Sequence, residues 1–291
     1  MNEAAGPAVT SFGTRLGQAF ARFGQLCVGI DPHPWLLEAW HLPDSPAGLR
    51  EFGLRVIDAS VGSVGIVKPQ VAFFERHGAA GFAALEEVLR SARSAGLLVI
   101  ADAKRGDLGS TVEAYGQAWL KPGADLESDA LTLSAYMGVG SLEPTIAMAL
   151  AHGKGGFLLA ATSNPEAAAL QRAVIGGGSG KSVAAGIVEG VIARNRAQST
   201  DGPGSVGVVI GATIDCASYG IDRDELAAAR IPILAPGFGH QGATFDQLRD
   251  RYGAAAPFTV VSVSRSVLAA GPAWITESIA AAADQVARCL G

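Results

Sequence analysis

Lysine and aspartate side chains gather where apolar segments of the chain come to an end. Asp102 and Lys104 are separated by one alanine, and Lys68 follows an earlier apolar run. Residues two apart on a strand point to the same side, so we expect Asp102 and Lys104 to face the same way. A lysine within about 4–6 Å of carboxylates keeps its proton, because the opposite charge favours its charged form. The pattern predicts a proton donor, and the alternative is a structural ion pair with Arg105 as a solvated neighbour.

A second group of residues has the character of an anion site. Gly237, Gly239 and Gly242 surround Gln241, and glycines allow backbone N–H groups to approach an anion closely. Arg265 follows the last apolar run and offers a guanidinium fork that matches phosphate oxygens. We interpret these residues as a phosphate site. Ordinary turn glycines with a surface arginine are the alternative.

Two other patterns are interpreted as carrying no chemistry. Gly180-Lys181-Ser182 ends a glycine-rich run and looks like part of a triphosphate-binding loop. That loop needs a glycine five residues before Gly180, where this chain has Ile175, and a strand directly before it. The run is therefore predicted to be a flexible linker or a lid. The five histidines lack metal-ligand spacing such as HxxxH, so we expect surface or core histidines and no metal site.

These side chains need a framework, and apolar runs that alternate with longer amphipathic segments supply one. Such uniformly apolar runs are typical of parallel strands covered by helices. Strands are expected at residues 25–31, 64–69, 97–104, 130–135, 156–162, 206–213, 231–236 and 258–265. Helices are expected around Phe12–Phe23 and, from apolar spacing, around 49–57, 82–89 and 275–290. This order predicts an α/β protein, a single-domain (β/α)8 TIM barrel over residues 1–291.

In a (β/α)8 barrel the carboxyl ends of the strands form the catalytic face. Asp31, Lys68, Asp102, Lys104 and Arg265 all fall at carboxyl ends of expected strands. The amino-terminal ends carry no comparable group of charges. The predicted barrel therefore brings the proton donor and the phosphate site to one mouth.

Composition argues against several other classes of protein. The 291 residues carry a net charge of −5, so no basic surface for nucleic acid is indicated. The longest apolar runs are far shorter than the ~18–20 residues of a membrane span, and residues 1–10 do not look like a secretory signal. The three cysteines are scattered, which favours a reducing compartment. We expect a cytoplasmic protein that binds neither nucleic acid nor membrane.

With these residues identified, the chain resembles the orotidine 5′-monophosphate decarboxylase family, in its longer bacterial subgroup (type 2). The segment Ile100-Ala-Asp102-Ala-Lys104-Arg-Gly-Asp107-Leu-Gly-Ser-Thr111 is similar to that family's signature. The likeness extends along the barrel from Asp31 to Arg265. Related barrel lyases share a DxKxxD core without this full set of strand-end residues. The resemblance implies decarboxylation of orotidine 5′-monophosphate to UMP in de novo pyrimidine biosynthesis, by a homodimer with shared active sites.

The resemblance also implies catalytic roles. Lys68, Asp102, Lys104 and Asp107 would form an alternating charged network, in which Lys104 protonates C6 of the pyrimidine after carbon dioxide leaves. Asp107, followed by Thr111, would reach into the active site of the other subunit. No pyridoxal, thiamine or metal motif is apparent, so no cofactor is expected and electrostatics must stabilise the carbanion.

Substrate-binding roles follow from the same resemblance. Asp31 and Lys68 would hold ribose hydroxyls, Ser163 would recognise the pyrimidine ring, and Gln241 and Arg265 would bind the phosphate. The long glycine-rich connection after Ser163 departs from the shorter family members.

Two alternative functions stay open at this point. A sister barrel, such as a 3-keto sugar-phosphate decarboxylase or a hexulose-phosphate synthase, would use a divalent metal to hold an enediolate. Lys68 and the segment around Ser163 favour the nucleotide substrate instead. A non-catalytic barrel that only binds a phosphate ligand is the other alternative, and the two lysines beside carboxylates argue against it.

Overall fold

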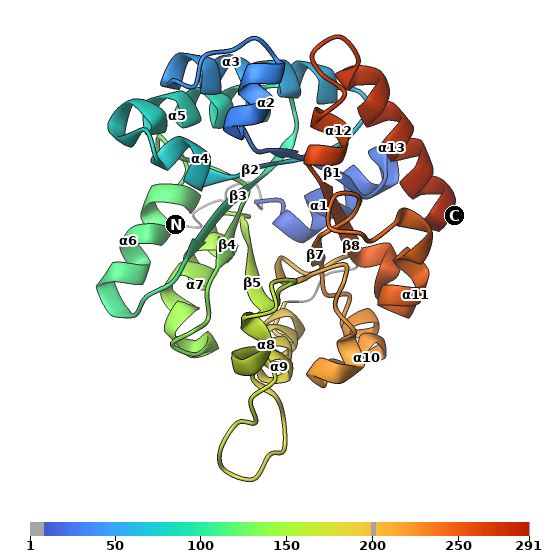
Figure 1. Cartoon of the computed structure of the whole chain (residues 1–291). Coiled ribbons are helices and arrows are strands. Elements are labelled where there is room, and N and C mark those ends of the chain that lie inside the picture. The colour runs from blue at the N-terminus through green and yellow to red at the C-terminus, as the bar shows by residue number, and fades with distance from the viewer. Residues whose placement is uncertain (1–8, 199–201, 291) are drawn as a thin grey trace, which may run out of the picture.

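In a computed structural model that describes residues 9–198 and 202–290, eight parallel strands pair in chain order and close into a barrel (Figure 1). β8 returns to pair with β1, where Val263 lies opposite Val28. The strands are β1 (Leu26–Ile30), β2 (Ile66–Pro69), β3 (Leu98–Arg105), β4 (Ala130–Leu133), β5 (Gly155–Ala161), β6 (Val206–Ile210), β7 (Ile233–Pro236) and β8 (Thr259–Val263). The prediction of a (β/α)8 barrel is confirmed.

Several strands end earlier than their apolar runs predict. β6 was expected to reach residue 213, but the chain turns at Gly211, whose carbonyl accepts the Ile214 N–H at 3.0 Å. β8 was expected to reach Arg265, but Ser264 leaves the extended conformation (φ −141°, ψ −88°) and a helix begins at Arg265. The early end of β8 places Ser264 and Arg265 at the barrel mouth.

Helices follow the strands around the outside of the barrel (Figure 1). The α-helices are α1 (Phe12–Phe23), α2 (Pro34–Ala39), α3 (Pro46–Ser60), α4 (Val71–Glu75), α5 (Gly78–Ser94), α6 (Gly109–Leu120), α7 (Glu143–Ala151), α8 (Ala167–Gln171), α9 (Val183–Arg196), α10 (Arg223–Ala228), α11 (Leu248–Tyr252), α12 (Arg265–Leu268) and α13 (Ile275–Leu290). Short 3-10 turns occur at Val139–Leu142, Cys216–Tyr219, Phe245–Gln247 and Gly253–Phe258.

Serine caps fix where some of these helices begin. The Ser11 hydroxyl accepts the Thr14 N–H at 3.1 Å, and α1 spans Phe12–Phe23 as predicted. Ser182 caps α9 in the same way. A serine before the first turn satisfies an N–H that the helix itself leaves unpaired.

The barrel interior is filled by side chains, and α1 closes its amino-terminal end. Phe12 and Leu16 of α1 are fully buried against inward-facing residues of the strands, among them Phe157, whose ring meets that of Phe12 edge-on at 6.0 Å. A larger core fills the layer between the strands and the outer helices. With the amino-terminal end closed, the open mouth lies at the carboxyl ends of the strands.

The glycine-rich run forms a hairpin, here called hairpin 174–182, in which Val174 and Ser182 pair antiparallel. It is the loop that extends away from the barrel between α8 and α9, at the bottom of Figure 1. Gly177, Gly178 and Gly180 all have positive φ, a conformation open to glycine but strained for other residues. None of the described helices combines the length and the apolar character needed to cross a membrane.

Candidate active site

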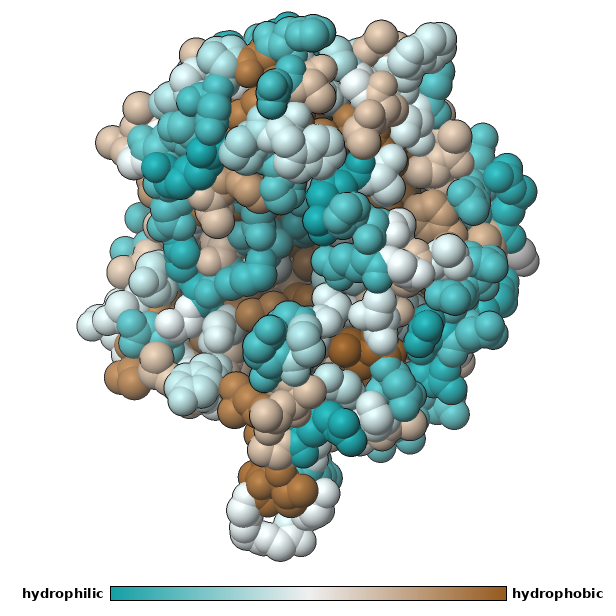
Figure 2. All heavy atoms as spheres, in the orientation of Figure 1, coloured by the Kyte–Doolittle hydropathy of each residue, from teal (hydrophilic) through white to brown (hydrophobic). Residues whose placement is uncertain are grey.

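A cavity of about 330 Å³ opens at the carboxyl ends of the strands. Figure 2 shows it as a hollow near the centre of the molecule, bordered by hydrophilic residues. Most of the residues predicted to do chemistry line this one cavity: Asp31, Lys68, Asp102, Lys104, Ser163, Gln241 and Arg265.

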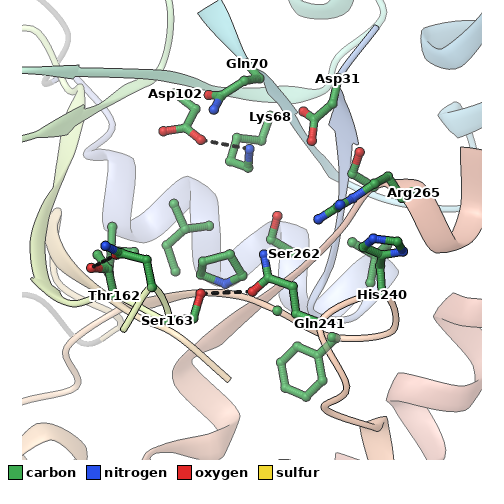
Figure 3. Close-up of a pocket in the computed structure, with 18 of the residues that line it drawn as sticks. Asp31, Lys68, Gln70, Asp102, Thr162, Ser163, His240, Gln241, Ser262 and Arg265 are labelled. Atoms are coloured by element: carbon green, nitrogen blue, oxygen red, sulfur yellow. Dashed lines mark hydrogen bonds and ion pairs between the residues drawn. The ribbon is translucent and has the colours of Figure 1, made fainter. Parts of the chain in front are cut away.

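One side of the cavity is organised around the carboxylate of Asp102 (Figure 3). Lys68 Nζ donates to Asp102 Oδ2 at 3.0 Å, and Lys104 Nζ donates to Oδ1 at 2.6 Å. Thr132 Oγ1 donates to Oδ1 at 2.9 Å. Gln70, with its amide nitrogen turned toward Asp102, donates to Oδ2 at 2.8 Å. These five residues, called the Asp102 cluster below, give the carboxylate four hydrogen-bond donors.

The two lysines of the cluster differ in their surroundings. Burial alone would lower the pKa of Lys68, but the carboxylates of Asp102 and Asp31 outweigh it and hold the pKa above its ordinary value. Burial would raise the pKa of Asp102, and the two lysines instead lower it to about 2. The side chain of Lys68 is 8% exposed, whereas that of Lys104 is 45% exposed. The cluster therefore holds one enclosed cation and one that reaches the open cavity.

The backbone that carries this cluster is bulged. Ala101 lies opposite Leu131 and Arg105 lies opposite Leu133, so three residues of β3 face only Thr132 of β4. Lys104 has φ +50°, a value that residues with a Cβ rarely adopt. The regular strand alternation expected for Asp102 and Lys104 is therefore wrong at Lys104. The side chains of the two residues nevertheless meet, as predicted. β-Bulges commonly redirect a side chain beside an active site.

The opposite side of the cavity carries the predicted phosphate residues (Figure 3). Ser163 Oγ donates to Gln241 Oε1 at 2.9 Å, which joins the loop after β5 to the loop after β7. Gly237 and Gly239 have φ +116° and +77°, and a Cβ on Gly239 would lie 2.7 Å from Cβ of Ser266. Glycine is therefore required for this loop to approach α12.

Two buried oxygen atoms between these sides have no hydrogen-bond partner among the described residues. They are Asp31 Oδ1 and Ser264 Oγ, and both residues line the cavity. A buried acceptor or hydroxyl without a partner costs about 1–3 kcal/mol, so such atoms are expected to bind a polar ligand. Hydroxyl groups of a ligand fit this requirement.

The structure does not bring Asp107 and Thr111 into the cavity. Asp107 Oδ1 accepts the N–H of Leu108 at 2.8 Å, and Thr111 is exposed on the first turn of α6. Neither residue lines the cavity of its own chain.

Some residues in or beside the cavity were not identified as functional from the sequence. Thr132 is the only polar residue in the apolar run of β4, which was the available signal. His33 and His240, expected to be surface or core histidines, both line the cavity. Burial lowers the pKa of His33, and the neighbouring Arg265 lowers it further against the opposing effect of Asp31. Within the described ranges, no three His, Cys, Asp or Glu side chains are grouped to hold a metal ion.

Comparison with known proteins shows which family the sequence matches. Residues 24–274 match the family model described as orotidine 5′-phosphate decarboxylase / HUMPS family. The chain is 49% identical over 276 residues to an orotidine 5′-phosphate decarboxylase of Salinispora arenicola, covering 95% of each chain. It is 46% identical over 263 residues to that of Corynebacterium efficiens, covering 90% of this chain and 91% of the relative.

Solved structures agree over the full barrel. A Streptomyces avermitilis protein assigned as an orotidine 5′-phosphate decarboxylase superimposes with a TM-score of 0.90 at 42% identity, covering 100% of this chain and 99% of the other. The OMP decarboxylase of Leishmania donovani gives 0.73 at 28% identity, covering 96% and 99%. The chain therefore belongs to the orotidine 5′-phosphate decarboxylase / HUMPS family.

Proposed function

We propose that this chain decarboxylates orotidine 5′-monophosphate to UMP, a reaction of pyrimidine biosynthesis that takes place in the cytoplasm. The observation that carries the proposal is the Asp102 cluster, which holds two lysines on one carboxylate at the edge of a cavity with an arginine and a glutamine opposite. Relatives at 46–49% identity carry the name of this activity.

The chemistry explains why such a cluster is needed. Loss of carbon dioxide leaves an electron pair on C6 of the pyrimidine, a vinylic carbon with poor delocalisation. A cation fixed near C6 stabilises that charge as it develops. At ~4 Å and an effective dielectric constant of ~20, one charge pair contributes ~4 kcal/mol, whereas large enzymatic rate enhancements need up to ~23 kcal/mol. Binding energy from remote groups must therefore contribute as well.

Lys104 is the proposed proton donor. Its Nζ is held by Asp102 on one side and reaches the open cavity on the other. When the bond between C6 and the carboxylate breaks, the electron pair stays on C6 and Lys104 transfers a proton to that carbon. Lys68 is more enclosed and fixes the position and charge of Asp102.

Other residues of the cavity are assigned to the rest of the nucleotide. Arg265 and Gln241 bind the phosphate, and the unpartnered Asp31 Oδ1, with Lys68 beside it, accepts ribose hydroxyls. Ser163, hydrogen-bonded to Gln241, recognises the pyrimidine ring. Phosphate binding energy then positions C6 against the Asp102 cluster.

The proposed enzyme is a homodimer with shared active sites. Asp107 and Thr111 lie outside the cavity of their own chain, which leaves them free to serve another copy. Leu108 and, on the loop after β4, Tyr136 are 60% and 78% exposed. Large apolar side chains exposed near the barrel mouth are typical of a protein interface.

The activity is tested by following the absorbance of orotidine 5′-monophosphate after addition of purified protein. We expect its conversion to UMP with no added cofactor, at the same rate with and without a strong chelator. Activity that disappears with chelator and returns with magnesium, together with turnover of a 3-keto sugar phosphate, would assign the chain to the metal-dependent branch of the family. Binding of UMP without any turnover would identify a non-catalytic barrel.

A further inference from the structure

Thr132 lies at the one point of β4 that faces the bulge of β3. It is 1% exposed, and the residues on either side of it in β4, Leu131 and Leu133, are the ones that keep regular register with β3. A threonine at this point is the only residue of β4 able to replace the ladder hydrogen bonds that the bulge removes.

The Thr132 hydroxyl makes two hydrogen bonds, both to the bulge. It accepts the backbone N–H of Lys104 at 2.9 Å and donates to Asp102 Oδ1 at 2.9 Å. A backbone N–H can only donate and an ionised carboxylate can only accept, so the hydroxyl proton must point at Asp102. The hydroxyl thus links the main chain of one catalytic residue to the side chain of another.

We propose that Thr132 is a positioning residue for catalysis: its hydroxyl holds the Lys104 backbone and the Asp102 carboxylate in the arrangement from which Lys104 Nζ reaches the substrate. This inference rests on the proposed decarboxylation.

The strain at Lys104 explains why such a link is needed. A non-glycine residue with positive φ costs about 1–3 kcal/mol and persists only where its surroundings enforce it. The Lys104 side chain is half exposed and its tip is held by Asp102, so the direction of its Cα–Cβ bond is set by the backbone. Without the Thr132 hydroxyl, the bulge loses its anchor and Nζ moves relative to C6. Misplacement by about 1 Å can cost on the order of 100-fold in rate.

The test compares three variants of the full-length protein. Thr132→Val keeps the shape and removes the hydroxyl, and Thr132→Ser keeps the hydroxyl and removes the methyl group. Thr145→Val is the matched control, because Thr145 is equally buried and its hydroxyl donates to the Val112 carbonyl in the packing of α7 on α6, outside the cavity. For each variant, kcat and KM for orotidine 5′-monophosphate are measured, together with hydrogen exchange at the Lys104 amide.

We expect Thr132→Val to lower kcat by roughly 10–100-fold with KM within about threefold of wild type. The reason is that a misplaced Lys104 loses its interaction with the transition state. Thr132→Ser should retain kcat to within about threefold, and Thr145→Val should retain the wild-type kcat. The Lys104 amide should exchange faster in Thr132→Val alone. If Thr132→Val does not fold, Thr132→Ala takes its place in the same comparison.

Three results would overturn the inference: a wild-type kcat in Thr132→Val, an equal loss in Thr132→Ser, or an unchanged Lys104 amide in Thr132→Val. A wild-type kcat would show that the Thr132 hydroxyl is not needed for positioning. An equal loss in Thr132→Ser would show that the methyl group is what matters. An unchanged amide would show that other contacts hold the Lys104 backbone. If the wild-type protein itself does not turn over orotidine 5′-monophosphate, the proposed function fails. The amide exchange still reports on the Thr132 hydrogen bond in that case.

Discussion

At the scale of single residues, the site depends on Asp102 and Lys68 keeping their charges although both are largely buried. Asp102 is almost enclosed, yet four hydrogen-bond donors, two of them lysine cations, keep it ionised. Removing Asp102 would leave Lys68 as a buried cation without a counter-charge, a change that is strongly destabilising. The same charges that position Lys104 therefore also stabilise the barrel mouth.

The pH dependence of stability follows from the sign of these shifts. The pKa of Asp102 is lowered from 3.8 to about 2 in the folded protein, so its ionised form stabilises the fold above pH 3.8 and that contribution is lost as pH falls toward 2. The pKa of Lys68 is raised above 10.5, so its contribution is present below pH 10.5 and is lost at higher pH.

Asp102→Asn should therefore lower the free energy of unfolding by on the order of 2–3 kcal/mol at pH 7. In urea unfolding, the difference in unfolding free energy between wild type and Asp102→Asn should be constant above about pH 4.5 and become smaller below it. Glu51→Gln, which breaks an exposed pair with Arg55, is the control and should change the unfolding free energy little. A difference that keeps growing as the pH falls would contradict the sign of the Asp102 shift.

At the scale of elements, the sequence predicted the strands well, because a parallel strand buried on both faces must be apolar along its length. It also predicted a helix around Phe12–Phe23, where the structure has α1 with Ser11 as its cap. The bulge in β3 could not be predicted, because it depends on the register with β4 and on the Thr132 hydroxyl, neither of which is local to Lys104. His33 and His240 were missed for a similar reason, since their placement comes from loops that meet only in the fold.

The strained backbone at Lys104 predicts how substitutions at this position affect stability. Lys104→Ala and Lys104→Gly both remove the proposed proton donor, so both should be inactive while still binding UMP. Glycine adopts φ +50° without strain, so Lys104→Gly should be more stable than Lys104→Ala by about 1 kcal/mol in urea unfolding.

Lys121 provides the control for this comparison. It is exposed and has φ −73°, so alanine there should be more stable than glycine. If the order of stability at position 104 matched the order at Lys121, the positive φ of Lys104 would carry no strain.

At the scale of the whole molecule, one chain supplies most of the proposed site but not Asp107 or Thr111. If the partner supplies them, each active site combines Lys104 of one subunit with Asp107 of the other. Lys104→Ala and Asp107→Ala should then each be nearly inactive as pure dimers.

Mixing the two variants tests this arrangement. In a mixed dimer one site carries both substitutions and the other carries neither. Random exchange of equal amounts makes about half of the dimers mixed, so about a quarter of the wild-type activity should return. The measurement is turnover of a co-refolded mixture, with each variant refolded alone as the control. A mixture as inactive as its components would mean that Asp107 serves its own subunit.

Hairpin 174–182 separates the first five strands of the barrel from the last three, so it is a site where the chain could be cleaved into two fragments that stay associated. It projects from the surface, lines no part of the cavity, and has five strands before it and three after it among the described residues. A protease that cleaved its glycine tip would leave two fragments still joined along the β5–β6 and β1–β8 edges. Exposed glycine-rich tips of this kind are also where chains accept insertions and new termini. Hairpin 174–182 is thus a natural place to split the gene into two co-expressed halves.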